Sequence, residues 1–93
     1  DTPYANRIYA LMASVYFFEE NYDAAMAMFN ATRLDLLGNE ERDDMTYRLA
    51  TCYLKTGNVK EAAIWFETLR STSKKYAADC TYYISYIRYT QQR

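Results

Sequence analysis

The sequence predicts an all-α fold in which antiparallel helix pairs stack as a solenoid, with five helices in about two and a half repeats. Only one proline and two glycines occur in 93 residues, which favours helix throughout. Small and aromatic residues also recur at fixed offsets. The positions are Ala13, Tyr16, Tyr22, Ala25 and Phe29, which return as Ala50, Tyr53, Val59, Ala62 and Phe66. A repeat period in the thirties is typical of stacked helix pairs.

The first helix pair is expected over residues 3–37. Thr2 followed by Pro3 reads as an N-cap and a first helical position, so a helix should run from Pro3 to about Glu19. Its apolar residues keep the 3–4 spacing of an amphipathic helix: Ile8, Leu11, Met12, Val15 and Phe18.

The second helix of this pair should begin after Asn21, which can act as its N-cap. We expect it to span Tyr22 to Leu36 and to end at Gly38 in a left-handed C-cap. Its buried stripe is predicted as Ala25, Met26, Met28, Phe29 and Thr32.

The second helix pair is expected over residues 40–71. Four carboxylates crowd its start, where negative charge complements the helix dipole: Glu40, Glu41, Asp43 and Asp44. This favours a solvated helix start over an acidic binding patch. Gly57 and Asn58 should form the turn inside the pair, with Glu61 completing a capping box. The following helix then runs from Val59 to about Arg70.

A polar connector at 71–75 leads to a lone helix over residues 75–92. In the repeat register the small residues Ala13, Ala50 and Ser85 are successive markers, so this helix is the first half of a third, incomplete unit. The chain is therefore expected to be a single domain and a piece of a longer repeat protein. Four tyrosines of this helix could line a groove or pack against a sixth helix, and the piece could self-associate through them. They are Tyr82, Tyr83, Tyr86 and Tyr89.

These offsets resemble the tetratricopeptide repeat family. That family has a small residue at position 8, tyrosine at 11, alanine at 20 and an aromatic residue at 24 of a 34-residue unit. The second copy, which adds Gly57 in the turn, matches more fully than the first, where Glu20 stands instead; the third has Ser85 but Arg88. The tyrosine-alanine openings at Tyr4 and Tyr76 are loosely similar to repeats of bacterial envelope proteins. The resemblance suggests the bacterial periplasm or outer membrane, with a cytoplasmic location as the alternative.

The resemblance implies a scaffold that binds a protein or peptide in an aromatic-lined concave groove formed by the first helix of each pair. Tyrosine suits such a surface because it joins a large apolar face to a hydroxyl. The alternative is a structural spacer or oligomerisation module inside a larger, possibly enzymatic, protein. The candidate groove residues are Arg7, Ser14, Phe17, Tyr47, Arg48, Thr51, Lys55, Tyr82, Tyr86 and Tyr89.

Other functions find little support in the composition. Histidine is absent, and Cys52 and Cys80 lack the spacing of a metal or redox motif, so we expect no enzyme, no cofactor and no metal site. Eleven basic residues oppose twelve acidic ones, which disfavours nucleic acid as a partner. The longest apolar run is too short to predict a membrane span.

Overall fold

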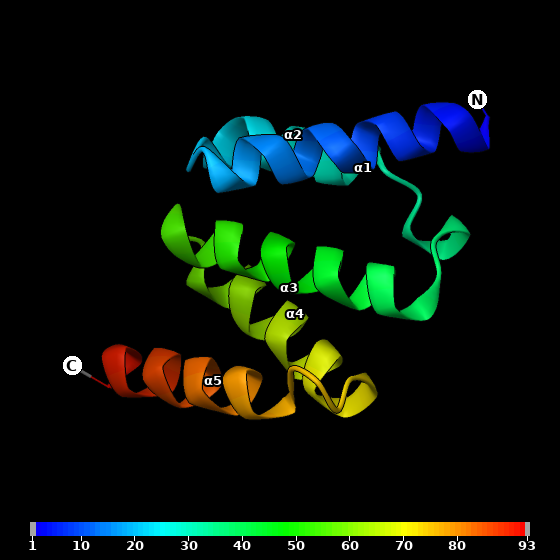
Figure 1. Ribbon diagram of the computed structural model, residues 1–93. Coiled ribbons are helices and arrows are strands. Elements are labelled where there is room, and N and C mark those ends of the chain that lie inside the picture. Colours follow the sequence, from blue (N-terminus) through cyan, green and yellow to red (C-terminus); the bar gives the residue numbers. More distant parts are fainter. Residues whose placement is uncertain (1, 93) are drawn as a thin grey trace.

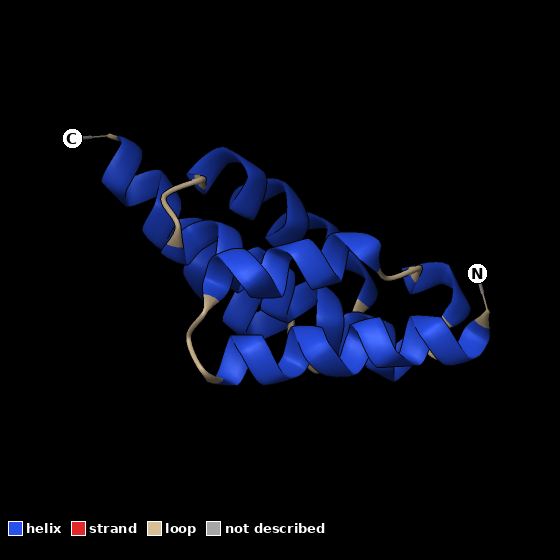
Figure 2. Cartoon of the chain, turned by 90° about the horizontal axis from the view of Figure 1, so that it is seen from above, coloured by secondary structure: helices blue, strands red, loops and turns tan. Residues whose placement is uncertain are grey.

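The computed structural model describes residues 2–92, and in that range the chain is entirely helical apart from its turns (Figures 1 and 2). This confirms the predicted all-α class with five α-helices. The elements in chain order are α1 (Pro3–Phe18), α2 (Tyr22–Ala31), the short 3-10 helix η1 (Leu34–Leu36), α3 (Asn39–Lys55), α4 (Val59–Thr72) and α5 (Ala77–Gln91).

The helices form two layers of a short solenoid. Each α-helix packs against the next one in the chain, and α1 also contacts α3. Figure 1 shows α1, α3 and α5 running in the same direction, with α2 and α4 behind them. The first helix of each pair therefore lies in one layer and the second helix in the other, as expected for a helical repeat.

The repeat pattern coincides with the interior. Ala13, Ala25, Ala50 and Ala62 are fully buried, because an alanine at a helix crossing lets two backbones approach closely. The aromatic residues of the pattern fill the space between the small ones. Two adjoining clusters result, one centred on Phe29 between α1, α2 and α3, the other on residues of α3, α4 and α5 around Phe66.

Local signals place several helix ends correctly. The Thr2 hydroxyl accepts a hydrogen bond from the Ala5 N–H at 3.2 Å, and the Asn21 side chain accepts one from Ala24 at 3.4 Å. Gly57 has a φ of 87°, the left-handed conformation expected of a turn glycine. The predicted capping box is wrong, since Asn58 makes no side-chain cap and instead donates to the Thr56 hydroxyl.

The end of the second helix is also a correction. The structure ends α2 at Ala31 rather than Leu36, and Gly38 lies at φ −64° and ψ 161° as the N-cap of α3. A left-handed C-cap at Gly38 is therefore wrong. The cause is a long-range contact, in which the buried Asn6 side chain binds both backbone groups of Arg33 and draws the chain out of helical geometry. Within α2, Met26 and Met28 are only half-buried.

The apolar stripe of α1 does not face the core. The side of α1 that is buried carries Asn6, Ala10 and Ala13. The stripe itself is exposed to solvent over Ile8, Leu11, Met12, Val15 and Phe18. Among the described residues, none of the helices combines the length and apolar character needed to cross a membrane.

Candidate functional site: a concave face with two hollows

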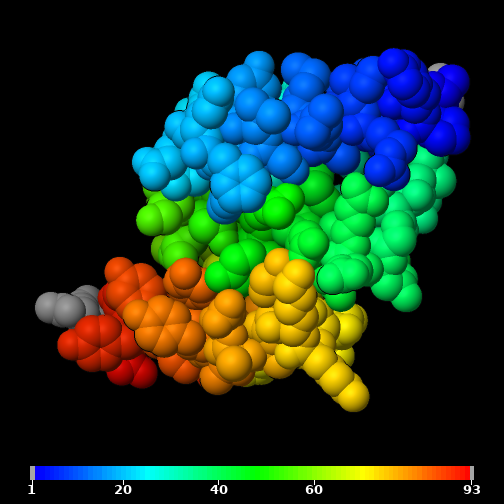
Figure 3. Space-filling view, viewed as in Figure 1, coloured from blue at the N-terminus to red at the C-terminus, as the bar shows by residue number. Residues whose placement is uncertain are grey.

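The parallel helices α1, α3 and α5 share one face of the molecule (Figures 1 and 3). That face is hollowed in two places, with volumes of about 560 Å³ between α3 and α5 and about 590 Å³ between α1 and α3. The tyrosine hollow is lined by Thr51, Leu54, Lys55, Val59, Tyr82, Tyr83, Tyr86 and Thr90. The charged hollow is lined by Tyr4, Arg7, Ile8, Ala10, Leu11, Ser14, Glu41, Asp44, Met45 and Arg48.

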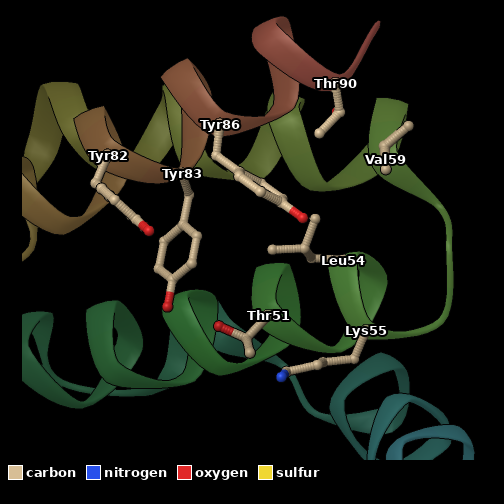
Figure 4. Close-up of a pocket in the computed structure, with 8 residues that line it drawn as sticks. All are labelled: Thr51, Leu54, Lys55, Val59, Tyr82, Tyr83, Tyr86 and Thr90. Atoms are coloured by element: carbon tan, nitrogen blue, oxygen red, sulfur yellow. The ribbon is translucent and has the colours of Figure 1, made fainter. Parts of the chain in front are cut away.

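The tyrosine hollow presents phenol rings opposite one cation. Figure 4 shows Tyr82, Tyr83 and Tyr86 extending from α5 toward α3, where Lys55 carries the only charge in the lining. Tyr82 is 66 % exposed and Tyr86 49 %, so both rings are open to a ligand. Among the described residues, no carboxylate lies within ion-pair distance of the Lys55 ammonium. The hollow thus offers stacking faces, hydroxyl groups and a positive charge.

The charged hollow carries both signs of charge. Arg7 lies 3.7 Å from Glu41 in a solvent-exposed ion pair that spans α1 and α3. Exposed pairs of this kind contribute little to stability, so both side chains can reorient toward a ligand.

Arg48 joins the two hollows. Its guanidinium donates a hydrogen bond to the Ser14 hydroxyl at 3.1 Å and lies 5.0 Å from the centre of the Phe18 ring. Thr51, one helical turn further along α3, already lines the tyrosine hollow. Because one face of α3 serves both hollows, they form a single continuous surface.

Beneath this surface lies an aromatic cluster that supports it. Tyr47 stacks on Tyr76 at 4.4 Å between ring centres, and Tyr83 stacks on Phe66 at 5.0 Å. Burial raises the pKa of the Tyr47 hydroxyl well above its usual value, so this group stays neutral. The cluster holds α5 against α3 and fixes the position of the hollow above it.

A polar contact borders the cluster. The Tyr76 hydroxyl donates to Asp44 at 2.5 Å and the Lys75 ammonium donates to the same oxygen at 3.1 Å. Burial raises the pKa of the Asp44 carboxyl, but these hydrogen bonds outweigh that effect and leave its pKa below the usual value. Asp44 is therefore an anion held at the edge of the charged hollow.

The structure distributes the predicted groove residues over three places. Thr51, Lys55, Tyr82 and Tyr86 meet in the tyrosine hollow, and Arg7, Ser14 and Arg48 meet in the charged hollow. Phe17 and Tyr47 are half-buried and pack against the interior clusters. Tyr89 is 59 % exposed and lies outside both linings.

Sequence reasoning missed several lining residues, and for four of them a signal was present. Tyr4 and Leu11 follow the helical spacing of Arg7 and Ser14, and Thr90 comes one turn after Tyr86. Glu41 lies two turns before Arg48 on the same face of α3. Completing each predicted helical face, and extending it by one or two turns, would have found them.

The cysteines lie away from this face. Cys52 and Cys80 are both buried free thiols, and burial raises the pKa of each to about 11. A protonated, enclosed thiol is a poor nucleophile. Within residues 2–92 no cluster of metal-binding side chains is found. The arrangement of the concave face suits binding by shape, stacking and charge.

Stacked helix pairs with a shared hollowed face define a helical-repeat protein of the solenoid type. Residues 7–31, which cover most of α1 and α2, match the tetratricopeptide repeat family. Searches of curated proteins and of solved structures find no significant match. Such a repeat supports a role as a protein–protein interaction module, and these repeats are typically non-catalytic scaffold elements. The envelope compartment stays a prediction.

Proposed function

We propose that the chain binds a peptide segment of a partner protein along its concave face. The observation that carries the proposal is the tyrosine hollow, in which exposed phenol rings converge on Lys55, a cation with no ion-pair partner among residues 2–92. The segment would place an aromatic or aliphatic side chain against Tyr82 and Tyr86, and a carboxylate near Lys55.

The chemistry of the hollow favours such a segment. A tyrosine ring provides a large contact area, loses little conformational entropy when it is fixed, and offers a hydroxyl for hydrogen bonding. A partner carboxylate beside Lys55 would form a charge-assisted hydrogen bond, which is shorter and stronger than a neutral one.

The spacing of Arg48 and Lys55 along α3 indicates how long the bound segment is. Arg48 and Lys55 are two helical turns apart, about 10 Å along the axis. An extended peptide covers that distance in about three residues. A partner carrying two carboxylates at this separation, on either side of an apolar residue, would place one beside Arg48 and the other beside Lys55.

A random peptide display library selected on the folded chain tests the proposal. We expect selected peptides to combine an aromatic or aliphatic residue with acidic ones. Tyr86→Ala should weaken their binding by about 1–2 kcal/mol, as for a contact at the centre of an interface. Lys55→Glu should weaken it further and reduce its salt sensitivity, because the new carboxylate repels the peptide while Arg48 still attracts it.

Ile64→Ala supplies the matched control. Ile64 is a large apolar residue of α4 that is 59 % exposed and lines neither hollow. Its loss should leave affinity unchanged. Peptides whose binding is equally indifferent to Tyr82→Ala, Tyr86→Ala and Ile64→Ala would show that the concave face is not the site.

A further inference from the structure

The outward side of α1 carries an apolar stripe that no described element covers. Ile8, Met12 and Val15 occupy one side of the helix at 3–4 spacing. They are 40 %, 37 % and 48 % exposed. Side chains of this kind in an amphipathic helix normally face a neighbour.

The internal repeat shows what kind of neighbour fits. In the register that aligns Ala13 with Ala50 and Ser85, each of the three stripe residues has an equivalent on α3 and on α5. On α3 the equivalents are Met45, Leu49 and Cys52, at most 3 % exposed; on α5 they are Cys80, Ile84 and Ile87, at most 2 % exposed.

Each buried triplet lies against the second helix of the preceding pair. The α3 triplet shares a cluster with Ala25 and Phe29 of α2, and the α5 triplet shares one with Ala62 and Phe66 of α4. Both covering helices present an alanine and a phenylalanine four residues apart, on one helical face. The same cover is what the α1 triplet lacks.

We propose that the α1 stripe docks a further helix pair of this repeat type, which covers Ile8, Met12 and Val15 with its second helix. That helix would carry a small residue and an aromatic residue four positions apart. The surface adjoins the concave face, because Ile8 also lines the charged hollow. It serves a different purpose, since it extends the stack instead of holding a ligand.

A second folded copy of this chain does not supply the required helix. α2 is already packed between α1 and α3, and α4 between α3 and α5, so the alanine and phenylalanine of each are buried. A copy could offer them only by opening its own core. The occupant is therefore a separate helix pair rather than a dimer partner.

The chain itself provides the probe. Tyr76 and Ala77 correspond in register to Tyr4 and Ala5, so a copy of residues 39–76 joined directly to Ala5 places α3 and α4 ahead of α1 as they stand ahead of α5. Val15→Cys reports on the stripe through its rate of maleimide labelling, read by mass spectrometry of the peptide that contains it. We expect labelling to be slower by about tenfold or more in the fusion than in the 93-residue chain, because burial against a packed helix blocks access.

Ile64→Cys, an exposed position on α4 of the original unit, should label at the same rate in both proteins. An unchanged labelling rate at Val15→Cys would overturn the proposal. This holds even if the added pair is not ordered in the fusion, because the same pair packs against α5 in the native chain and should pack against α1 in the same way. Sedimentation of the 93-residue chain tests the other occupant. A dimer in which Val15→Cys is protected, with protection lost on dilution, would assign the stripe to a second copy and overturn the proposal.

Discussion

The side-chain amide of Asn6 binds both backbone groups of Arg33, which lies beyond the end of α2. Its nitrogen donates to the Arg33 carbonyl at 3.1 Å, and its oxygen accepts from the Arg33 N–H at 2.6 Å. Asn6 is only 3 % exposed, so these groups exchange hydrogen bonds with each other and not with water. The contact ties the N-terminal part of α1 to the segment that follows α2.

Removal of this amide should destabilise the chain. We expect Asn6→Ala to lower the free energy of unfolding by about 2 kcal/mol, because it leaves a backbone donor and acceptor of Arg33 without their partner. Urea denaturation measures the change, and hydrogen exchange at the Arg33 amide should lose its protection. Asn30→Ala, at an exposed position of α2, is the control and should cost little. Equal effects of the two substitutions would contradict the role given to Asn6.

Asn6 also shows where the sequence stops being informative. Its partner is 27 residues away, and nothing near Leu36 marks the earlier end of α2. Local sequence signals predicted the helix ends and turns correctly where the residues that fix them are close in sequence, as at Thr2 and at the left-handed Gly57. They failed at Gly38, because a tertiary contact had already ended the helix.

Two tyrosines of the predicted groove also show how far the sequence can predict the site. Tyr47 and Tyr82 occupy equivalent positions of the repeat, and the period places both on the concave side. Tyr47 is half-buried because Tyr76 and Tyr83 pack on it from α5. Tyr82 is 66 % exposed, since no described helix follows α5. The period predicts the side of the helix, but the neighbour decides whether a residue supports the surface or lines it.

Arg48 and Phe18 should be coupled energetically. The guanidinium lies 5.0 Å from the ring centre and links α3 to α1. A double-mutant cycle with Arg48→Met and Phe18→Leu should give a coupling energy of about 0.5–1 kcal/mol. Both substitutions keep an apolar stem, so chemical denaturation of the four proteins isolates the ring contact. Strictly additive effects would mean that the two side chains are neighbours without mutual stabilisation.

Asp44 should give the chain an acid-sensitive component of stability. Its pKa is lower in the folded chain than its usual value, so the carboxylate stabilises the fold above the unfolded pKa of about 4, and this contribution is lost as pH falls through the folded pKa. We expect Asp44→Asn to be less stable than the wild type by roughly 1 kcal/mol at pH 7. The difference should shrink as pH falls below about 4.

Urea midpoints between pH 7 and pH 3 measure this difference. Tyr76→Phe is a useful companion, because it removes one donor to Asp44 while keeping the ring that stacks on Tyr47. Its acid loss should lie between those of the wild type and Asp44→Asn. If the urea midpoints of all three proteins fell in parallel as pH decreases, Asp44 would not be the cause of the stability lost in acid.

Both thiols should be unreactive in the folded chain. With a pKa of about 11, Cys52 and Cys80 hold roughly 0.1 % thiolate at pH 8. We expect disulfide exchange with Ellman's reagent to be slower by about a hundredfold or more than in urea-unfolded chain. Ser71→Cys, at an exposed site of α4, should react quickly in the same protein. Fast reaction of either native thiol would contradict the packing of its helix.

Glu20 and Gly57 occupy equivalent turns of the two helix pairs, and both have positive φ, 61° and 87°. Only glycine adopts this conformation without steric cost. A Cβ added at Gly57 would meet nothing within 4 Å, so the cost of a substitution there comes from the backbone conformation. We therefore expect Glu20→Gly to stabilise the chain by about 1 kcal/mol and Gly57→Ala to destabilise it by a similar amount.

Glu20→Ala separates backbone strain from charge. It removes the carboxylate but keeps a Cβ in the left-handed conformation, so its stability should stay close to that of the wild type. Thermal and urea unfolding of the four proteins measures these differences. A gain from Glu20→Ala as large as that from Glu20→Gly would assign the cost at this turn to the charge. A gain in stability from Glu20→Gly but not from Glu20→Ala would assign the cost at this turn to backbone strain. The first turn then differs from the second because it lacks a glycine.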